Sequence, residues 1–572
     1  MATTLSPVKQ NPEKLIWLFL LGWTLLNAVQ AATLGLHSDE AYYWLYSRFL
    51  DWGYYDHPPM VAVFIRIGYS LFANEFGLRL ITILSSTVAL RVLWLTIRNY
   101  NPDARWFILV AGGTFIFHIY GFITTPDAPL FFFTILFYYC FQRYLKEDKW
   151  QTAILLAIIL ACLLYSKYHA VLLIGFTVAA NIKLLKRGTF WLIPAITATL
   201  YIPHIYWQIS HGYPSVNYHL FERSSEVYDF AHTYLFIPGQ LLMAGPLIGW
   251  LFFYLLGRVK IKDAFIRTLL VNCVGTLIFF LINTLKGNVQ PHWTLIAFAP
   301  LAMLVLIYFN QKPAIPAWYQ KLAVANLVFV VLIRLLLISN LPFVTKLGAV
   351  KSFYNYDKWA KEIKQKAGDA YVIFPNSFQD PSKYSFYTHT IKGFSYDSRF
   401  YRRTQFDIWP LEDSLQNKRT FYLETKPSIK LKTDSIFTPQ GKFYLVQIDS
   451  TRTYQRIKIE SDQYKVSAAP GQQHVFYLKV TNPTERAVDF SNKNKLHELV
   501  LGACFMQDDA QPFAQRADTS FYSIKLQPHQ SANYTFTVKT PPQKGHYDLI
   551  FSLRTTPFQG GHNSRIINFT VE

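Results

Sequence analysis

Long apolar segments fill the first 345 residues and constrain this chain more than any other feature. An α-helix of about 20 apolar residues crosses the roughly 30 Å hydrocarbon layer of a bilayer and pairs its own backbone polar groups. We therefore predict an α-helical polytopic membrane protein with about eleven or more transmembrane helices. The predicted spans are 15–36, 76–98, 105–122, 127–145, 151–165, 168–184, 189–208, 234–256, 265–283, 293–309 and 320–342.

The charges of the loops predict how these helices are oriented. With the N-terminus in the cytoplasm, the cytoplasmic loops and helix ends carry 16 Lys and Arg residues and the opposite loops carry 5. This bias follows the positive-inside rule. An odd number of spans then places the region after residue 345 outside the cytoplasm. The first span also fits a signal peptide, but its apolar run is longer than such peptides use and further spans follow it.

The polar motifs of the first 345 residues fall on the external side of this topology. They are "HSDEAYYWLYSRFLDWGYYDHPP", "TTPDAP", "SKYH", "SHGYPSVNYHLFERSSE" and "KGNVQPHW". A transporter distributes polar groups along a pathway near the midplane and often contains an internal repeat. Polar groups gathered at one face favour chemistry at one interface. A transporter or flippase with an external recognition domain is the alternative hypothesis.

Two amphipathic segments flank the acidic part of the first external loop. Segments 39–50 and 59–72 are too short to span a membrane, and their aromatic and apolar side chains suit helices that lie at the lipid surface. Gly53 and the Pro58-Pro59 pair predict a turn between them. The acidic residues of this loop are therefore expected to be held at the membrane surface.

The composition changes after residue 345, where no further span is found. Segment 346–435 alternates helical and strand patterns, which predicts a small α/β domain, and 436–572 has strands separated by turns, which predicts an immunoglobulin-like β-sandwich. The four cysteines are too scattered for a disulfide framework or a cysteine-based metal site. The net charge of +20 favours contact with anionic headgroups, and no nucleic-acid motif is present.

The external motifs together carry a resemblance to a known family. Asp39 and Glu40 open the first external loop, "DHPP" closes it, and "TPDAPL" begins a later external helix. This combination resembles the GT-C membrane glycosyltransferases, in the branch of the protein O-mannosyltransferases that includes the aminoarabinose transferases acting on lipid A. The match covers about residues 10–345. The predicted domains are thus a GT-C domain over 1–345, an α/β domain over 346–435 and a β-sandwich over 436–572.

The resemblance implies a sugar transfer outside the cytoplasm. The donor is a polyprenyl-phosphate sugar, and the acceptor is a hydroxyl or phosphate on a lipid, a glycan or a protein. The expected location is a bacterial inner membrane, with periplasmic C-terminal domains. Asp39 takes the place of the family's catalytic aspartate and would be the general base, with Glu40 orienting it or the sugar. A single displacement would invert the anomeric configuration.

The same resemblance assigns the remaining candidate residues. A divalent metal ion is the cofactor it allows, with Asp56 and His219 as candidate ligands. His57 stands where the lipid A branch has a lysine, so a fixed positive charge is replaced by one that titrates near neutrality. Tyr42 stands where that branch has an arginine, which is a second departure. The candidate substrate-binding residues are Tyr43, Tyr54, His57, Asp127, Lys167, Arg223, Lys286 and His292.

Ordinary structural roles are open for several of these residues. Asp39 and Glu40 suit the first turn of a helix capped by Ser38, and Asp127 suits a helix that begins at Pro126. His219 and His292 suit interfacial positions, and Tyr54 suits an aromatic belt. Arg334, deep in the last span, is expected to face the bundle interior or water.

Overall fold

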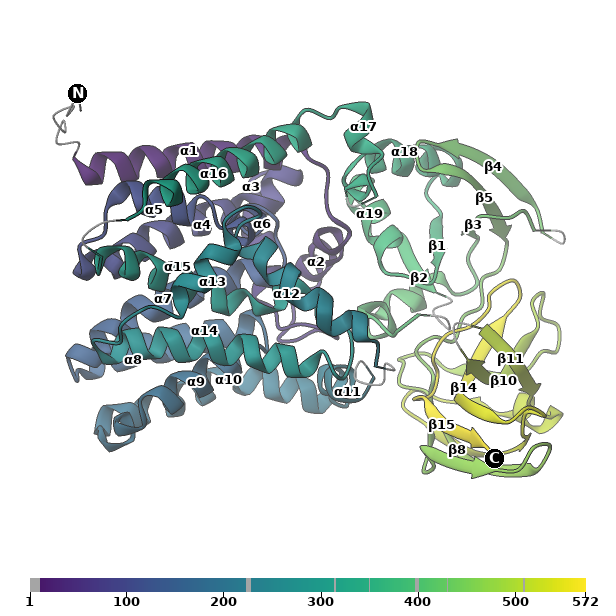
Figure 1. Ribbon diagram of the computed structural model, residues 1–572. Coiled ribbons are helices and arrows are strands. Elements are labelled where there is room, and N and C mark those ends of the chain that lie inside the picture. Colours follow the sequence, from purple (N-terminus) through teal and green to yellow (C-terminus); the bar gives the residue numbers. More distant parts are fainter. Residues whose placement is uncertain are drawn as a thin grey trace, which may run out of the picture. The chain divides into compact units, whose positions relative to one another are not determined.

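The computed structural model describes residues 11–222, 228–312, 315–348, 350–396, 401–428, 431–507 and 510–572. The chain divides into two compact units, residues 1–354 and 355–572. The first is a bundle of helices and the second combines two helices with β-sheets (Figure 1). A helical N-terminal region with several apolar helices and a sheet-rich C-terminal region confirm the predicted class.

Helices occupy all of the predicted spans, and the two predicted surface segments form α2 and α3. The bounds in the first unit are α1 Pro12–Thr33, α2 Ser38–Arg48, α3 Met60–Leu71, α4 Glu75–Ile97, α5 Ala104–Ala111, α6 Phe115–Ile119, α7 Asp127–Lys146, α8 Trp150–Ser166, α9 Ala170–Ala180, α10 Leu192–Ser210, α11 Pro214–Asn217, α12 Phe230–Ala244, α13 Gly249–Leu256, α14 Ala264–Asn283, α15 Leu295–Asn310, α16 Ala317–Ile338 and α17 Pro342–Thr345.

The described residues contain five helices that are long and apolar enough to cross a membrane, namely α1, α4, α14, α15 with the turn before it, and α16. The pair α12 and α13 adds a sixth if it counts as one span, although its two parts are bent by 97°. This makes the chain an integral membrane protein. The larger number of eleven spans stays a prediction.

Two of the predicted spans are broken helices. Segment 105–122 divides into α5 and α6, and segment 234–256 divides into α12 and α13. The fully buried Asn326 of α16 bonds to both breaks: its amide nitrogen donates to the Gly113 carbonyl at 2.8 Å, and its amide oxygen accepts the N–H of Leu247 at 3.0 Å. Breaks inside apolar surroundings are tolerated when neighbouring side chains pair the freed backbone groups.

The second unit begins with a mixed sheet that is covered by α18 (Tyr356–Ala367) and α19 (Gln379–Tyr387). Its strand order is β2-β1-β3-β5-β4, in which β1 is parallel to β2 and β3 and the other pairs are antiparallel. The bounds are β1 Tyr371–Pro375, β2 Gly393–Tyr396, β3 Thr420–Glu424, β4 Thr433–Thr438 and β5 Gly441–Ile448. The predicted boundary at residue 435 is therefore wrong, because β4 crosses it and β5 completes the mixed sheet.

The rest of the second unit is a β-sandwich. One sheet has the order β11-β10-β14-β15-β7 and the other β13-β8-β6, and their facing apolar side chains form a separate core. The bounds are β6 Lys458–Ser461, β7 Lys465–Ala468, β8 Gln473–Thr481, β9 Val488–Asp489, β10 Leu499–Gln507, β11 Ala510–Arg516, β12 Lys525–Leu526, β13 Ser531–Lys539, β14 Gly545–Thr555 and β15 Ile567–Val571.

Candidate active site

The predicted external loop after α1 holds its first two acidic residues at the start of α2. Helix α2 begins directly after the loop that follows α1, and its first turn carries Asp39 and Glu40. His37, rather than the expected Ser38, is the N-cap: the N–H of Asp39 donates to His37 Nδ1 at 3.3 Å, and Glu40 accepts the N–H of His37 at 2.9 Å. This capping box fixes both carboxylates at the start of the helix.

Glu40 is a buried member of an ion pair with Arg79 of α4. Both side chains are fully buried, and Arg79 donates through Nε and Nη2 to the two carboxylate oxygens at 2.8 and 2.6 Å. Arg79 also donates to the carbonyls of residues 31, 34 and 35, and Glu40 accepts the N–H of Thr124 at 3.0 Å. Glu40 thereby joins α1, α2, α4 and the segment before α7. All of these bonds indicate a positioning role for Glu40.

Asp39 lies in a different environment from its neighbour. Its side chain is 38% exposed, and its carboxylate lies 3.7 Å from His37 Nδ1. Tyr43, one turn further along α2, is buried, and burial raises the pKa of its hydroxyl well above the usual value. The negative charges of Asp39, Asp56 and Asp127 raise that pKa further. These three carboxylates therefore lie within electrostatic reach of the Tyr43 hydroxyl.

Asp56 is held by tyrosines of α2. It is 4% exposed, and its Oδ1 accepts the hydroxyls of Tyr46 at 2.9 Å and Tyr42 at 3.3 Å. The next residue, His57, lies with its ring 5.8 Å from that of Tyr43 and 6.2 Å from that of His219. The predicted loop thus delivers Asp56 and His57 to the same side of α2 as Asp39.

The start of α7 and the end of α8 bring an acid and a base together. Asp127 begins α7, Lys167 follows α8, and the lysine Nζ donates to both carboxylate oxygens at 2.8 Å. Both side chains are almost completely buried. His292 Nε2 lies 4.0 Å from the same carboxylate, and its ring lies 6.2 Å from that of Tyr120. The charge of Lys167 is therefore balanced by Asp127.

Four histidines lie beside this pair. His169 at the start of α9 is within electrostatic reach of Lys167, His57, His219 and His292. Three other histidines and Lys167 thus lie close to His169, and this region of the bundle is the candidate active site. Arg223 lies outside the described residues. Lys286 is exposed, and no contact in the described part of the chain joins its side chain to the site.

Tyr54 is a structural residue. It is fully buried, its ring stacks on Tyr46 at 3.9 Å, and its hydroxyl lies 2.9 Å from the Tyr46 carbonyl and 3.0 Å from the Phe49 carbonyl. It also accepts the N–H of Asp51 at 3.1 Å. These contacts close the C-terminal end of α2 and leave no exposed surface for a substrate. These contacts favour a structural role for Tyr54, and its predicted substrate-binding role stays a prediction.

The proposed metal ligands do not form a metal site with their neighbours. Asp56 Oδ1 is used by the two tyrosines, and His219 Nε2 donates to the Asp56 backbone carbonyl at 2.9 Å, which takes up that nitrogen. Across the residues that the structure covers, no three His, Cys, Asp or Glu side chains are grouped so that they could hold a metal ion. The arrangement of Asp56 and His219 thus does not fit the divalent ion that the resemblance allows.

Sequence reasoning missed two residues of this region. Arg79 lies inside the predicted span 76–98, and a cation within an apolar segment signals a buried partner. His169 follows "SKY" in the external motif "SKYH" but stands next to a long apolar run, so its place at the site depends on the fold.

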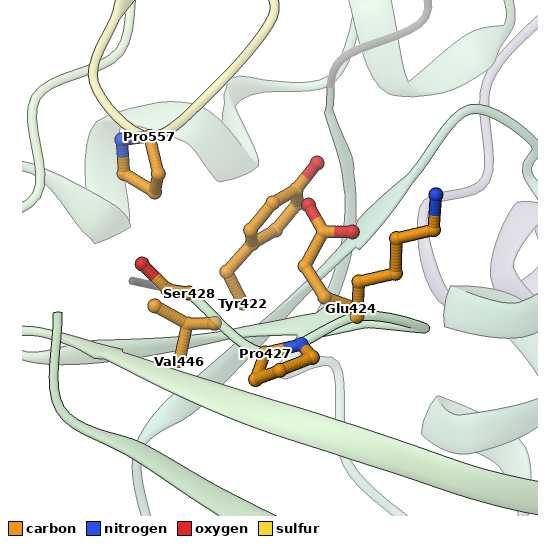
Figure 2. A pocket seen from close by; sticks show the side chains of 7 residues that line it. Tyr422, Glu424, Pro427, Ser428, Val446 and Pro557 are labelled. Carbon is orange, nitrogen blue, oxygen red and sulfur yellow. The ribbon is translucent and has the colours of Figure 1, made fainter. Parts of the chain in front are cut away.

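A separate cavity of about 230 Å³ lies in the second unit, between the mixed sheet and the loop after β14. Figure 2 shows the Tyr422 hydroxyl and the Glu424 carboxylate pointing in the same direction at this cavity, with Pro557 across from them. None of the predicted site residues lines it.

Part of the sequence and the fold are similar to known proteins. The family model described as dolichyl-phosphate-mannose-protein mannosyltransferase matches residues 56–207. The lipid A galacturonosyltransferase RgtD of Rhizobium johnstonii is 24% identical over 216 residues, which cover 35% of this chain and 45% of that relative. The match therefore spans less than half of the relative's length.

The fold is similar to solved structures of ArnT from Cupriavidus metallidurans. In the apo state the TM-score is 0.58 at 13% identity, covering 76% of this chain and 98% of that chain. The structure bound to undecaprenyl phosphate gives a TM-score of 0.56 at 13% identity, covering 75% and 97%. The chain is thus similar to GT-C glycosyltransferases in part of its sequence and in its fold.

Proposed function

We propose that this protein moves a sugar from a polyprenyl-phosphate donor to an acceptor hydroxyl on the extracytoplasmic side of a bacterial inner membrane. The observation that carries the proposal is the state of Asp39. Glu40, Asp56 and Asp127 are buried and hydrogen-bonded, whereas Asp39 is half-exposed and accepts no hydrogen bond from the described residues. Asp39 is thus the carboxylate that can accept a proton from a substrate.

The chemistry follows from that position. Asp39 takes the proton of the acceptor hydroxyl, whose oxygen attacks the anomeric carbon of the donor sugar. The bond between this carbon and the phosphate oxygen breaks, and its electron pair leaves with the polyprenyl phosphate. Because the attack comes from the face opposite the phosphate, the anomeric configuration inverts.

The departing phosphate needs positive charge or hydrogen-bond donors. Because Asp127 balances the charge of Lys167, we assign the charge that meets the phosphate to His57 and His292, which lie on two other segments near this pair. The undecaprenyl phosphate named for the ArnT structure supports a carrier of this class. Each of these histidines must be protonated to contribute its charge.

The acceptor is a lipid, a glycan or a protein. The lipid A substrate named for the Rhizobium relative supports a glycolipid, although only part of that relative is matched. Since Asp56 and His219 do not offer a metal site, we derive no step through a metal ion.

Mass spectrometry of the glycolipids and glycoproteins of cells with and without the gene tests the proposal. We expect one sugar-bearing product to disappear without the gene and to return with the wild-type chain, but not with Asp39→Asn. Asp51→Asn is the matched control in the same loop, because Asn retains an acceptor for the bond from Trp207 to Asp51. Identical glycan profiles with and without the gene would refute the proposed function.

A further inference from the structure

A cluster of polar side chains lies inside the helical bundle, about one turn from its external end. Asn27 and Gln30 come from α1, His118 from α6 and Arg334 from α16, and we call them the Arg334 cluster. Their exposed fractions are 0%, 0%, 3% and 3%, respectively. The residues around them are apolar: Trp23 packs on His118 at 4.7 Å, and Phe122 lies 5.1 Å from the Arg334 guanidinium.

Arg334 has no carboxylate to balance its charge. Its Nε donates to Gln30 Oε1 and its Nη1 donates to His118 Nδ1 at 3.2 Å, and it makes no salt bridge within the described part of the chain. Arg79 offers a comparison, because its guanidinium lies 5.5 Å from the same Phe122 ring and is paired with Glu40. Burying an ion without a partner is costly, so the charge of Arg334 calls for an anion.

His118 cannot supply or remove charge in this arrangement. Its Nε2 lies 2.6 Å from the Gly112 carbonyl, which only accepts, so Nε2 carries a proton. Its Nδ1 faces the Arg334 Nη1, which only donates, so Nδ1 is the acceptor. The imidazole is therefore neutral, and the cluster has a net charge of +1.

Several polar atoms of the cluster lack partners among the described residues. These buried atoms are Arg334 Nη2, Gln30 Nε2, and both Nδ2 and Oδ1 of Asn27. Nε and Nη2 lie on the same edge of the guanidinium, and this edge can bind a carboxylate through both nitrogens. On this edge Nε already donates to Gln30 Oε1, so an acceptor for Nη2 would lie beside the Gln30 side chain. Asn27 lies one turn earlier on the same face of α1.

We propose that the Arg334 cluster binds one small monovalent anion of the halide class. A charge of +1 balances one negative charge, and the donors Arg334 Nη2 and Gln30 Nε2 would coordinate it. Complete burial favours a small ion over a bulkier anion such as phosphate or an organic acid. The ion would hold α1, α6 and α16 together, and α6 leads into the segment that carries Tyr120 and Asp127. This site is separate from sugar transfer and does not depend on the proposed function.

Halide titration of the purified full-length chain in detergent tests this site. Gluconate would replace the halide at constant ionic strength, and thermal unfolding would be followed by intrinsic fluorescence. We expect Tm to rise by about 2 to 4 °C between millimolar and physiological chloride, because an ion that binds only the folded state stabilises it. Crystals grown in bromide should show an anomalous peak beside Arg334. Tm independent of chloride, together with only a water in the cluster, would overturn the proposal.

Two variants supply the negative charge from within the chain. Gln30→Glu places a carboxylate against the guanidinium edge, and Asn27→Asp places one a turn away, so each should fold and lose most of the halide response. Arg98→Gln is the control, because Arg98 is exposed and already pairs with Glu13 at 3.8 Å, and it should keep the full response. An undiminished response in Gln30→Glu would show that the halide binds elsewhere. If neither variant folds, the bromide position in the wild-type crystal decides.

Discussion

Asp39 and Glu40 are neighbours in the chain, yet their carboxylates lie in opposite environments. Successive residues of a helix point about 100° apart, so the turn that exposes Asp39 directs Glu40 into the bundle against Arg79. Asp39 would thus perform the chemistry, whereas Glu40 would hold α2 in place.

Replacing Glu40 with Gln tests this division of roles. Gln has nearly the same shape but no charge, so Arg79 would remain buried without a counterion, and we expect a loss of about 3 to 5 kcal/mol in the free energy of unfolding. Thermal unfolding of the purified variant measures it. Asp39→Asn should unfold like the wild type. A normal Tm for Glu40→Gln combined with lost transfer would assign Glu40 to the chemistry.

Donor binding should depend on pH through His57. A histidine binds phosphate well only when protonated, so donor affinity should fall as the pH rises through about 6.5. His57→Lys carries a charge throughout this range, so it should bind the donor more tightly than the wild type at pH 8. The affinity for undecaprenyl phosphate would be measured at several pH values between about 5.5 and 8, a range that includes the ordinary pKa of histidine.

Lys286→Ala is the control for that experiment. The Lys286 side chain is exposed and remote from the contacts described above, so its loss should leave the pH profile unchanged. A wild-type affinity that does not vary with pH would exclude histidines as the phosphate-binding groups.

The candidate site was partly predictable at the residue scale. The motifs placed Asp39, Asp127, Lys167 and His292 on one face, and the structure brings their segments together. The sequence could not show that the Tyr54 hydroxyl bonds to the C-terminal end of α2, because that contact depends on how the loop folds back. It also could not show that Asp127 neutralises Lys167, since these residues meet only through the packing of α7 and α8.

At the scale of elements, the first loop depends on a close approach to α10. Gly53 lies against two side chains of that helix: a Cβ at this position would lie 2.4 Å from Trp207 Cε3 and 3.0 Å from His204 Nδ1. The absence of a side chain lets the loop pack closely enough to direct Asp56 and His57 toward the site.

Gly53→Ala should therefore displace the loop. Because Asp56 and His57 follow within one turn's length of chain, we expect sugar transfer in membranes to fall on the order of tenfold, the cost of moving reacting groups out of line. Gly22→Ala on α1 is the matched control, since its added Cβ would meet no atom within 4 Å. Equal transfer rates for the two variants, at equal expression, would contradict this role of the loop.

The elements themselves were largely predictable, apart from their breaks. Apolar runs of helical length located the helices, because such runs can satisfy their backbone only as helices in lipid. The divisions between α5 and α6 and between α12 and α13 depend on Asn326, which is distant in sequence from both. A hydropathy pattern contains no signal for that pairing.

At the scale of the whole molecule, the fall in hydropathy after residue 345 marks the change of unit closely, since the two compact units meet at 354 and 355. The boundary within the second unit was misplaced, because strands of a mixed sheet and of a sandwich have the same alternating pattern. Pairing of β5 with β3 and β4 is a tertiary property.

The topology predicts on which side of the membrane each part lies. Reporter fusions after residues 145 and 260 should show cytoplasmic activity, and fusions after 209 and 350 should show extracytoplasmic activity, because the basic residues favour the cytoplasmic side. Cytoplasmic activity at both 209 and 350 would place the candidate site on the wrong side for the proposed reaction.

The rate of sugar transfer by purified Asp39→Asn is the most direct test of the proposed mechanism, once the donor and acceptor are identified. Asn preserves the size of the side chain but cannot take the acceptor's proton, so we expect turnover to fall by about 10² or more. Donor binding and Tm should match the wild type, since Glu40 and the histidines are unchanged. Transfer near the wild-type rate would remove Asp39 from its role as the base.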